Sequence, residues 1–114
     1  MIQTAILGFG TVGSGVAEVL TGHEKSISRK AHELIGLKYI LDVRDFTGNP
    51  FEGCFVKDFS VIENDPEVEI VVETIGGVTA ALDYSVRALK AGKSVVTSNK
   101  ELVAQLSTPY IATR

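Results

Sequence analysis

The stretch Gly8-Phe9-Gly10-Thr11-Val12-Gly13 has the spacing G-x-G-x-x-G. The apolar run 2–7 comes directly before it, and the short length of this run together with the following glycine favours a buried strand over a helix. After the glycines, apolar residues recur at helical spacing from 12 to 20, which predicts a helix ending near Gly22. A strand, a glycine loop and a helix in this order are the context in which the spacing indicates a dinucleotide site.

Each glycine of the stretch has a physical reason. The first, Gly8, allows a tight turn out of the strand, and Gly10 allows the backbone to approach a pyrophosphate. Gly13 allows the helix to pack closely on the strand, and the first N–H groups of that helix face the phosphates. The alternative is a glycine-rich turn in another α/β domain, because 11 glycines in 114 residues can produce the spacing by chance.

The rest of the chain continues the alternation of strands and helices. We expect strands at 37–43, 68–73 and 94–97, helices at 24–34, 58–64 and 100–106, and turns and loop from 45 to 57. A further helix is predicted to have Thr79 as its N-cap, an apolar face with Leu82, Val86 and Leu89, an Asp83–Arg87 pair, and Gly92 after its end. This order predicts an α/β fold of the Rossmann type, a doubly wound parallel sheet with helices on both faces.

Composition narrows the function classes. A formal net charge of −3 argues against a nucleic-acid or anionic-membrane surface, without excluding a local basic pocket. Cys54 is the single cysteine, so no intramolecular disulfide can form, and we interpret it as an apolar filler rather than a nucleophile. No metal-ligand spacing, signal peptide or membrane-length apolar run is found, so a cytoplasmic protein is expected; His23 and His32 are interpreted as solvated.

The end of the second predicted strand bears on cofactor choice. An acidic residue there takes the adenosine ribose hydroxyls in NAD-preferring domains, whereas a nearby arginine accommodates a 2′-phosphate. This chain has both Asp42 and Arg44. Strand alternation puts them on the same side, so the two can also simply pair with each other. We favour Arg44 as a 2′-phosphate contact over a solvated arginine; Lys57 either assists or is a surface lysine.

Three segments resemble the homoserine dehydrogenase family. They are residues 5–16 (AILGFGTVGSGV), 70–77 (IVVETIGG) and 88–100 (ALKAGKSVVTSNK), the last close to ALKAGKHVVTANK in that family; VRD at 43–45 also matches. The resemblance covers about residues 2 to 104. It implies NAD(P)-linked interconversion of L-homoserine and L-aspartate 4-semialdehyde, a step towards threonine and methionine.

The resemblance also implies site residues. The pyrophosphate would be held by the glycine loop, that is by Phe9, Gly10, Thr11, Val12 and Gly13. The adenosine ribose would lie by Arg44. The nicotinamide ribose would be lined by Thr74, Ile75 and Gly76. Ser98, Asn99 and Lys100 would reach the nicotinamide and substrate end. A cation such as Lys100 suits hydride loss from an alcohol carbon, because the oxygen must lose its proton while its charge is held. The alternative for Lys100 is a surface lysine at a helix start. Glu73 either hydrogen-bonds in the site or anchors a turn.

Family members have a second domain that supplies another catalytic lysine, the groups that hold the substrate and an interface between identical subunits. We expect residues 1–104 to form the NAD(P)-binding domain, with 105–114 unassigned and the catalytic domain absent. The isolated chain is then expected to bind dinucleotide weakly and not to turn over homoserine. The alternatives are a non-catalytic nucleotide-sensing module and another dehydrogenase of an amino-acid pathway, since fold and glycine loop do not separate these.

Overall fold

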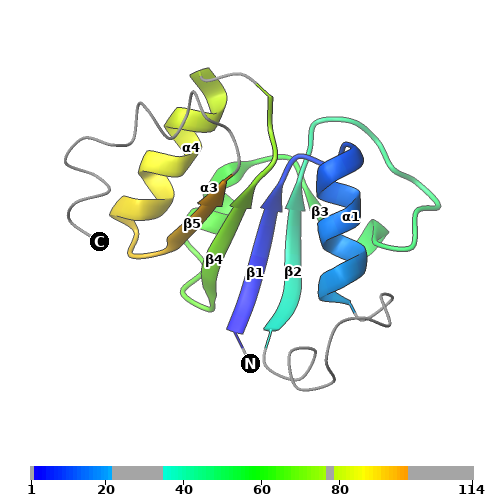
Figure 1. The fold of residues 1–114 in the computed structure, drawn as a ribbon, viewed down its shortest axis with the longest axis horizontal. Helices are drawn as coiled ribbons and strands as arrows, with labels where there is room; N and C mark the ends of the chain where they lie inside the picture. Colours follow the sequence, from blue (N-terminus) through cyan, green and yellow to red (C-terminus); the bar gives the residue numbers. More distant parts are fainter. Residues whose placement is uncertain (1, 22–34, 77–78, 98–114) are drawn as a thin grey trace.

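The computed structural model describes residues 2–21, 35–76 and 79–97, which form an α/β fold around one parallel sheet (Figure 1). Its elements, in chain order, are β1 (Ile2–Leu7), α1 (Thr11–Leu20), β2 (Ile35–Leu41), the 3-10 helix η1 (Glu52–Cys54), β3 (Phe55–Val56), α3 (Phe59–Glu63), β4 (Val68–Glu73), α4 (Thr79–Lys90) and β5 (Ser94–Thr97). No helix in these ranges is long and apolar enough to cross a membrane.

The strand order β3-β2-β1-β4-β5 places the first strand in the middle of the sheet. Leu7 of β1 lies in register with Leu41 of β2 on one side and with Glu73 of β4 on the other, and Glu73 is in register with Thr97 of β5. The carboxyl ends of the strands therefore meet at one edge. Because the chain winds outward in opposite directions from β1, a crevice opens at that edge between β1 and β4, where sheets of this topology bind ligands.

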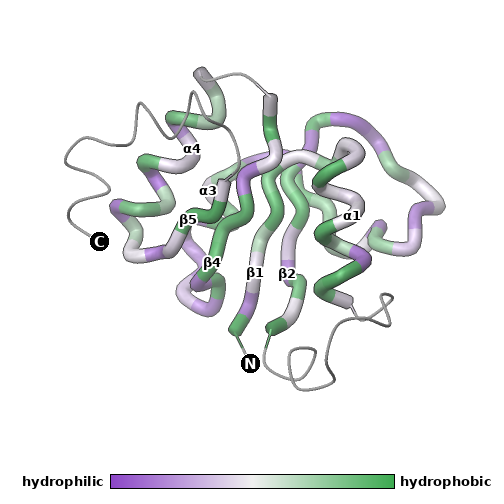
Figure 2. Tube along the Cα trace, in the orientation of Figure 1, coloured by the Kyte–Doolittle hydropathy of each residue, from purple (hydrophilic) through white to green (hydrophobic). Residues whose placement is uncertain are grey.

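The hydrophobic core lies on both faces of the sheet. Ile6 packs with Ala17 of α1, whereas its neighbour Leu7 packs with Phe59 of α3 on the other face, and both strand residues are fully buried. Such two-sided burial explains why β1 is a nearly continuous apolar run rather than an alternating one. Figure 2 shows hydrophobic residues concentrated in the strands.

The predicted strands 2–7, 68–73 and 94–97 are confirmed with the same bounds. The helix after the glycine loop is confirmed as α1, which ends at Leu20, two residues before the predicted end near Gly22. The predicted helix 58–64 is α3, with Asp58 accepting a hydrogen bond from Ser60 N–H as its N-cap. Helix α4 is also confirmed, although Thr79 is its first residue rather than its cap. The helices predicted at 24–34 and 100–106 lie outside the described residues.

Two predictions in the middle of the chain were wrong in part: one in the bounds of a strand, the other in its description as loop. The strand predicted at 37–43 starts and ends two residues earlier, because the Asp42 carboxylate accepts a hydrogen bond from Arg44 N–H and turns the chain there. The stretch 45–57, interpreted as turns and loop, contains η1 and β3. Strand β3 has only two residues, which pair with Ile40 and Leu41, so no periodicity in its own sequence could reveal it.

Helix α4 is fixed at three places. Its predicted apolar residues Leu82, Val86 and Leu89 pack around Ala81, while Ala81, Ser85 and Ala88 are fully buried. The predicted Asp83–Arg87 pair is present at 3.7 Å, but Arg87 lies closer to Glu63 of α3, at 2.7 Å. The predicted terminal glycine, Gly92, has φ +87, and Lys93 N–H donates to Ala88 O (3.0 Å), which closes the last turn.

Candidate functional site

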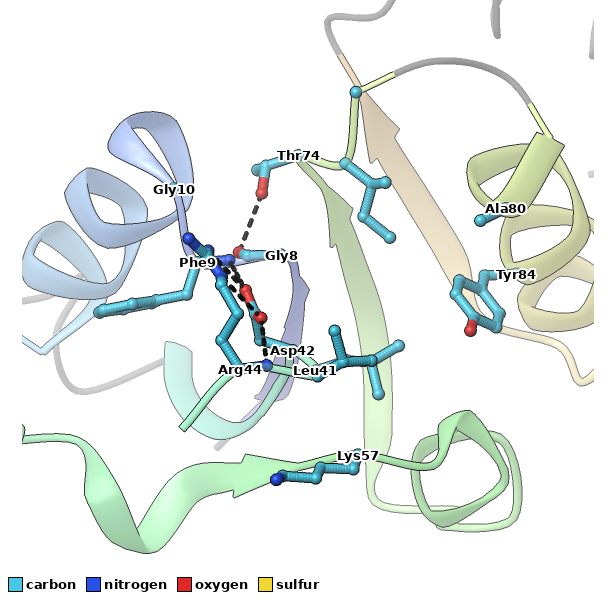
Figure 3. Close-up of a pocket in the computed structure, with 13 residues that line it drawn as sticks. Gly8, Phe9, Gly10, Leu41, Asp42, Arg44, Lys57, Thr74, Ala80 and Tyr84 are labelled. Carbon is cyan, nitrogen blue, oxygen red and sulfur yellow. Dashed lines mark hydrogen bonds and ion pairs between the residues drawn. The ribbon is translucent and has the colours of Figure 1, made fainter. Parts of the chain in front are cut away.

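A cleft of about 460 Å³ opens at the carboxyl ends of β1, β2 and β4 (Figure 3). Its lining comes from four parts of the chain: Gly8, Phe9 and Gly10 of the glycine loop; Leu41, Asp42, Val43, Arg44 and Lys57 around β2 and β3; Thr74, Ile75 and Gly76 after β4; and Ala80 and Tyr84 of α4. The cleft therefore lies at the crevice that the strand order creates.

The three glycines of the loop differ in what surrounds them. Gly8 has φ +93, and its N–H donates to Leu41 O at 2.7 Å, so it makes the turn out of β1. A Cβ on Gly13 would lie 2.1 Å from Gly8 O, so α1 approaches the turn as closely as a backbone allows. A Cβ on Gly10 would meet nothing within 4 Å. The turn thus requires a glycine at 8, and the packing of α1 requires one at 13. At Gly10 the absence of a side chain leaves open space facing the cleft.

The N-terminus of α1 carries no capping group of its own. Gly10 is the N-cap, no side chain among the described residues caps the helix, and the first turn holds no acidic residue. The backbone N–H groups and the positive end of the helix dipole are consequently available to an anion.

Thr74 ties the loop after β4 to the glycine turn. Its Oγ1 lies 2.7 Å from Leu7 O and 3.0 Å from Gly8 O, so its single hydroxyl hydrogen is shared between the two carbonyls that enter the turn. Its N–H also donates to Leu7 O, at 2.9 Å. Thr74 lines the cleft, and its polar atoms hold the shape of the glycine loop.

Asp42 and Arg44 pair with each other, as one of the sequence interpretations proposed. Arg44 Nε lies 3.0 Å from Asp42 Oδ1 and Nη2 lies 2.9 Å from Oδ2, while Phe9 N–H donates to Oδ2 at 3.0 Å. The Arg44 guanidinium lowers the pKa of Asp42 to about 2, and the backbone donors Arg44 N–H and Phe9 N–H add to this effect. The Asp42 side chain is 8% exposed and that of Arg44 is 60% exposed. A turn after β2 brings the two together, not the alternation of a strand.

The opposite wall of the cleft includes two residues that the sequence analysis missed, Ala80 and Tyr84. They lie four positions apart on α4, and the Tyr84 ring stacks on Phe59 with centroids 4.8 Å apart. Their i, i+4 spacing at the start of the helix after β4 was a usable signal. Lys57 also lines the cleft, and its Nζ lies 2.9 Å from Asp45 Oδ1.

The remaining predicted residues fall in three groups. Thr11 and Val12 are exposed at the start of α1 and Gly13 is buried behind the turn, so these three do not line the cleft. Ser98, Asn99 and Lys100 lie outside the described residues. Glu73 is 2% exposed, does not line the cleft, and accepts a hydrogen bond from Thr97 Oγ1 at 2.5 Å. It therefore anchors β4 to β5.

Burial raises the pKa of the Cys54 thiol, in keeping with the interpretation of this cysteine as an apolar filler rather than a nucleophile.

The crevice at the switch in strand order, the first glycine with its positive φ and the uncapped helix N-terminus together define a Rossmann-type dinucleotide-binding domain. The sequence model of one family, described as "Homoserine dehydrogenase, NAD binding domain", matches residues 8–109. The chain belongs to this family. Its cofactor is accordingly a nicotinamide dinucleotide, NAD or NADP, as the glycine loop predicts.

Individual relatives of this chain support the same family. Homoserine dehydrogenase from Methylobacillus glycogenes is 36% identical over 99% of this chain and 28% of its own length, and that from Corynebacterium glutamicum is 41% identical over 90% of this chain and 24% of its own length. The crystal structure of S. aureus homoserine dehydrogenase at pH 7.0 superposes with a TM-score of 0.76 at 30% identity, covering 97% of this chain and 29% of the other. This chain thus spans less than a third of the length of these relatives.

Proposed function

We propose that the chain is the cofactor-binding part of an enzyme that interconverts L-homoserine and L-aspartate 4-semialdehyde. The observation that carries the proposal is the cleft at the switch in strand order, in a chain whose family is that of homoserine dehydrogenase NAD-binding domains. We assign residues 1–104 to the cofactor-binding domain. Groups that hold the amino group of the substrate, and an interface between identical subunits, would belong to parts of the enzyme outside this chain.

The cleft residues fit a dinucleotide. The open space over Gly10 admits a pyrophosphate next to the backbone, and the uncapped N-terminus of α1 offers N–H donors to it. Arg44 and Lys57 lie at one side of the cleft, where they suit the phosphate-bearing adenosine ribose, and Thr74, Ile75 and Gly76 lie after β4. When bound, the dinucleotide supplies the hydride acceptor for alcohol oxidation and the hydride donor for the reverse reaction.

Ser98, Asn99 and Lys100 directly follow β5, whose carboxyl end is in register with that of β4. We assign Lys100 to the substrate oxygen: oxidation of the alcohol needs its O–H proton removed and the charge on the oxygen held as the hydride leaves the carbon. The order of β4, β5 and this segment supports the assignment, because ligands in such sheets bind beyond the carboxyl ends of the strands.

A domain exchange tests the proposal. Residues 1–104 would replace the aligned part of the Methylobacillus glycogenes enzyme, which is 36% identical to this chain, and homoserine-dependent reduction of NAD and NADP would be followed by absorbance. We expect the exchanged enzyme to be active. Lys100→Met should lower its kcat by about a hundredfold or more, which is the usual effect of removing a group that assists proton transfer or holds charge on the reacting oxygen. Lys90→Met, a lysine on the last turn of α4, is the matched control and should leave kcat unchanged.

The opposite results are equally clear. A folded exchanged enzyme that binds dinucleotide but has no homoserine-dependent rate would contradict the proposed activity. Full activity in the Lys100→Met variant would contradict the role of Lys100 alone.

A further inference from the structure

We infer that Asp42 is a positioning residue for cofactor selectivity: it holds Arg44 in place as a preformed cation that favours a 2′-phosphorylated dinucleotide, and does not itself bind the ribose. The inference rests on the proposed dinucleotide site. It reverses the usual meaning of an acidic residue after the second strand, which is to accept the ribose hydroxyls of a cofactor without the 2′-phosphate.

The first argument is the number of donors that Asp42 already accepts. Oδ1 receives Arg44 N–H (2.9 Å) and Nε–H (3.0 Å), and Oδ2 receives Phe9 N–H (3.0 Å) and Arg44 Nη2–H (2.9 Å). A carboxylate offers about four lone-pair positions, so this one is saturated. The side chain is 8% exposed, which leaves little of it within reach of a ligand. A ribose hydroxyl would have to displace an existing donor.

The second argument is what the pair leaves on Arg44. Of the five N–H donors of a guanidinium, those at Nη1 and the second at Nη2 remain for a ligand. The group is held on one edge by Asp42 and over the Phe46 ring, whose centroid lies 5.1 Å from Cζ, yet 60% of the side chain is exposed. Figure 3 shows dashed lines that join the Asp42 carboxylate both to Phe9 and to Arg44. A guanidinium fixed in this way loses little freedom when it binds a phosphate.

The third argument is the charge around this position. Lys57 lines the same cleft, and within the described part of the chain its Nζ pairs with the exposed Asp45 carboxylate at 2.9 Å. The side chain of Lys57 is 61% exposed and that of Asp45 is 83% exposed. Because ion pairs between such exposed side chains are weak, the Lys57 ammonium can leave Asp45 and turn towards a phosphate. The cleft therefore presents two cations with unused donors, whereas its one buried carboxylate is neutralised by Arg44.

The test measures the affinity of the full 114-residue chain for NADP⁺ and for NAD⁺ by NMR titration, which suits weak binding. The variants are Asp42→Asn, Arg44→Ala and both together, with Asp45→Asn as the control that removes the same charge from a neighbouring carboxylate. Simple electrostatics predicts that removing either negative charge raises NADP⁺ affinity. We expect Asp42→Asn instead to lower NADP⁺ affinity by about tenfold, the size of one charge-assisted pair, and NAD⁺ affinity by less than about twofold.

Further outcomes follow from the same measurements. If Asp42 acts through Arg44, the double variant shows no loss of NADP⁺ affinity beyond that of Arg44→Ala. Asp45→Asn should leave NADP⁺ affinity unchanged or slightly raised. Arg44→Lys keeps the charge on an exposed side chain but lacks the planar fork that makes two parallel hydrogen bonds to the carboxylate, so it should also lose most of the preference for NADP⁺.

Three results would overturn the inference. Equal losses for NADP⁺ and NAD⁺ in Asp42→Asn would make the residue only an anchor of the glycine loop. A gain for NADP⁺ with a loss for NAD⁺ would make it a ribose ligand. An unchanged preference in Arg44→Lys, which does not depend on the stability of the Asp42 variant, would show that the bridged pair is unnecessary. Failure of the unaltered chain to bind either dinucleotide would instead contradict the proposed function.

Discussion

Thr74 and Gly13 lie against each other across the turn between β1 and α1. A Cβ on Gly13 would come within 2.9 Å of Thr74 Oγ1, and within 2.1 Å of Gly8 O. The third glycine is therefore fixed both by the carbonyl of the first and by a side chain that follows β4, 61 positions along the chain (13 to 74). The glycine loop is a three-segment structure, and its shape depends on the strand that crosses from the other half of the sheet.

Gly13→Ala should destabilise the fold strongly. The added methyl group would overlap a backbone oxygen that cannot move without opening the turn, so we expect a loss of about 3 kcal/mol or more in the free energy of unfolding. Urea denaturation followed by circular dichroism measures it. Gly15→Ala is the matched control on the same helix: a Cβ there meets nothing within 4 Å, so it should stabilise by about 0.5 to 1 kcal/mol. Equal stability of the two variants would refute the packing argument.

Thr74→Val replaces the hydroxyl that holds the turn by a methyl group of nearly equal volume. Leu7 O and Gly8 O would lose their side-chain donor, and we expect a loss of about 1 to 3 kcal/mol in the free energy of unfolding, with weaker dinucleotide binding because the glycine loop is no longer held. Thr74→Ser keeps the donor and should retain most of both. Urea denaturation measures the stability of the two variants, and NMR titration measures their dinucleotide affinity. A Thr74→Val variant with unaltered stability would contradict the role assigned to the hydroxyl.

Asp65 makes stability depend on pH in the acid range. Its carboxylate accepts hydrogen bonds from Tyr39 (2.8 Å) and from Glu67 N–H (2.9 Å) and lies 2.6 Å from Lys38 Nζ, and these donors, Lys38 foremost, lower its pKa from 3.8 to about 2. Because the folded-state pKa lies below the unfolded-state value, the contribution is complete above pH 3.8 and is lost as the pH falls through about 2.

Asp65→Asn should consequently be less stable than the unaltered chain at pH 7, and the gap should narrow as the pH falls from 3.8 towards 2. Asp83→Asn is the control, since Asp83 is 64% exposed and its contact with Arg87 is 3.7 Å long. Urea midpoints measured at several pH values test this, and a constant gap across the acid range would be the contrary result.

Local sequence was sufficient where neighbours along the chain set the requirement. The turn at Gly8, the apolar runs of β1 and β4 and the glycine after α4 each have a local physical reason, and the structure confirms these four features. What remained open depends on distant partners. Strand β3 exists because Ile40 and Leu41 pair with it, and Asp42 is saturated only because Phe9 N–H lies next to it. Ala80 and Tyr84 reach the cleft through the packing of α4 on the sheet.

The most direct test of the central claim is an NMR titration of the ¹⁵N-labelled chain with NADP⁺. The sheet offers an internal comparison, because a second hollow of about 400 Å³ lies at the opposite, amino-terminal edge, between Ile2, Val68 and Ser94. We predict that the amide signals of Gly8, Gly10 and Gly76 shift with a single saturating curve, while those around the second hollow do not. Shifts confined to the amino-terminal edge, or no saturable shift at the glycine loop, would contradict the assignment of the cleft as the dinucleotide site.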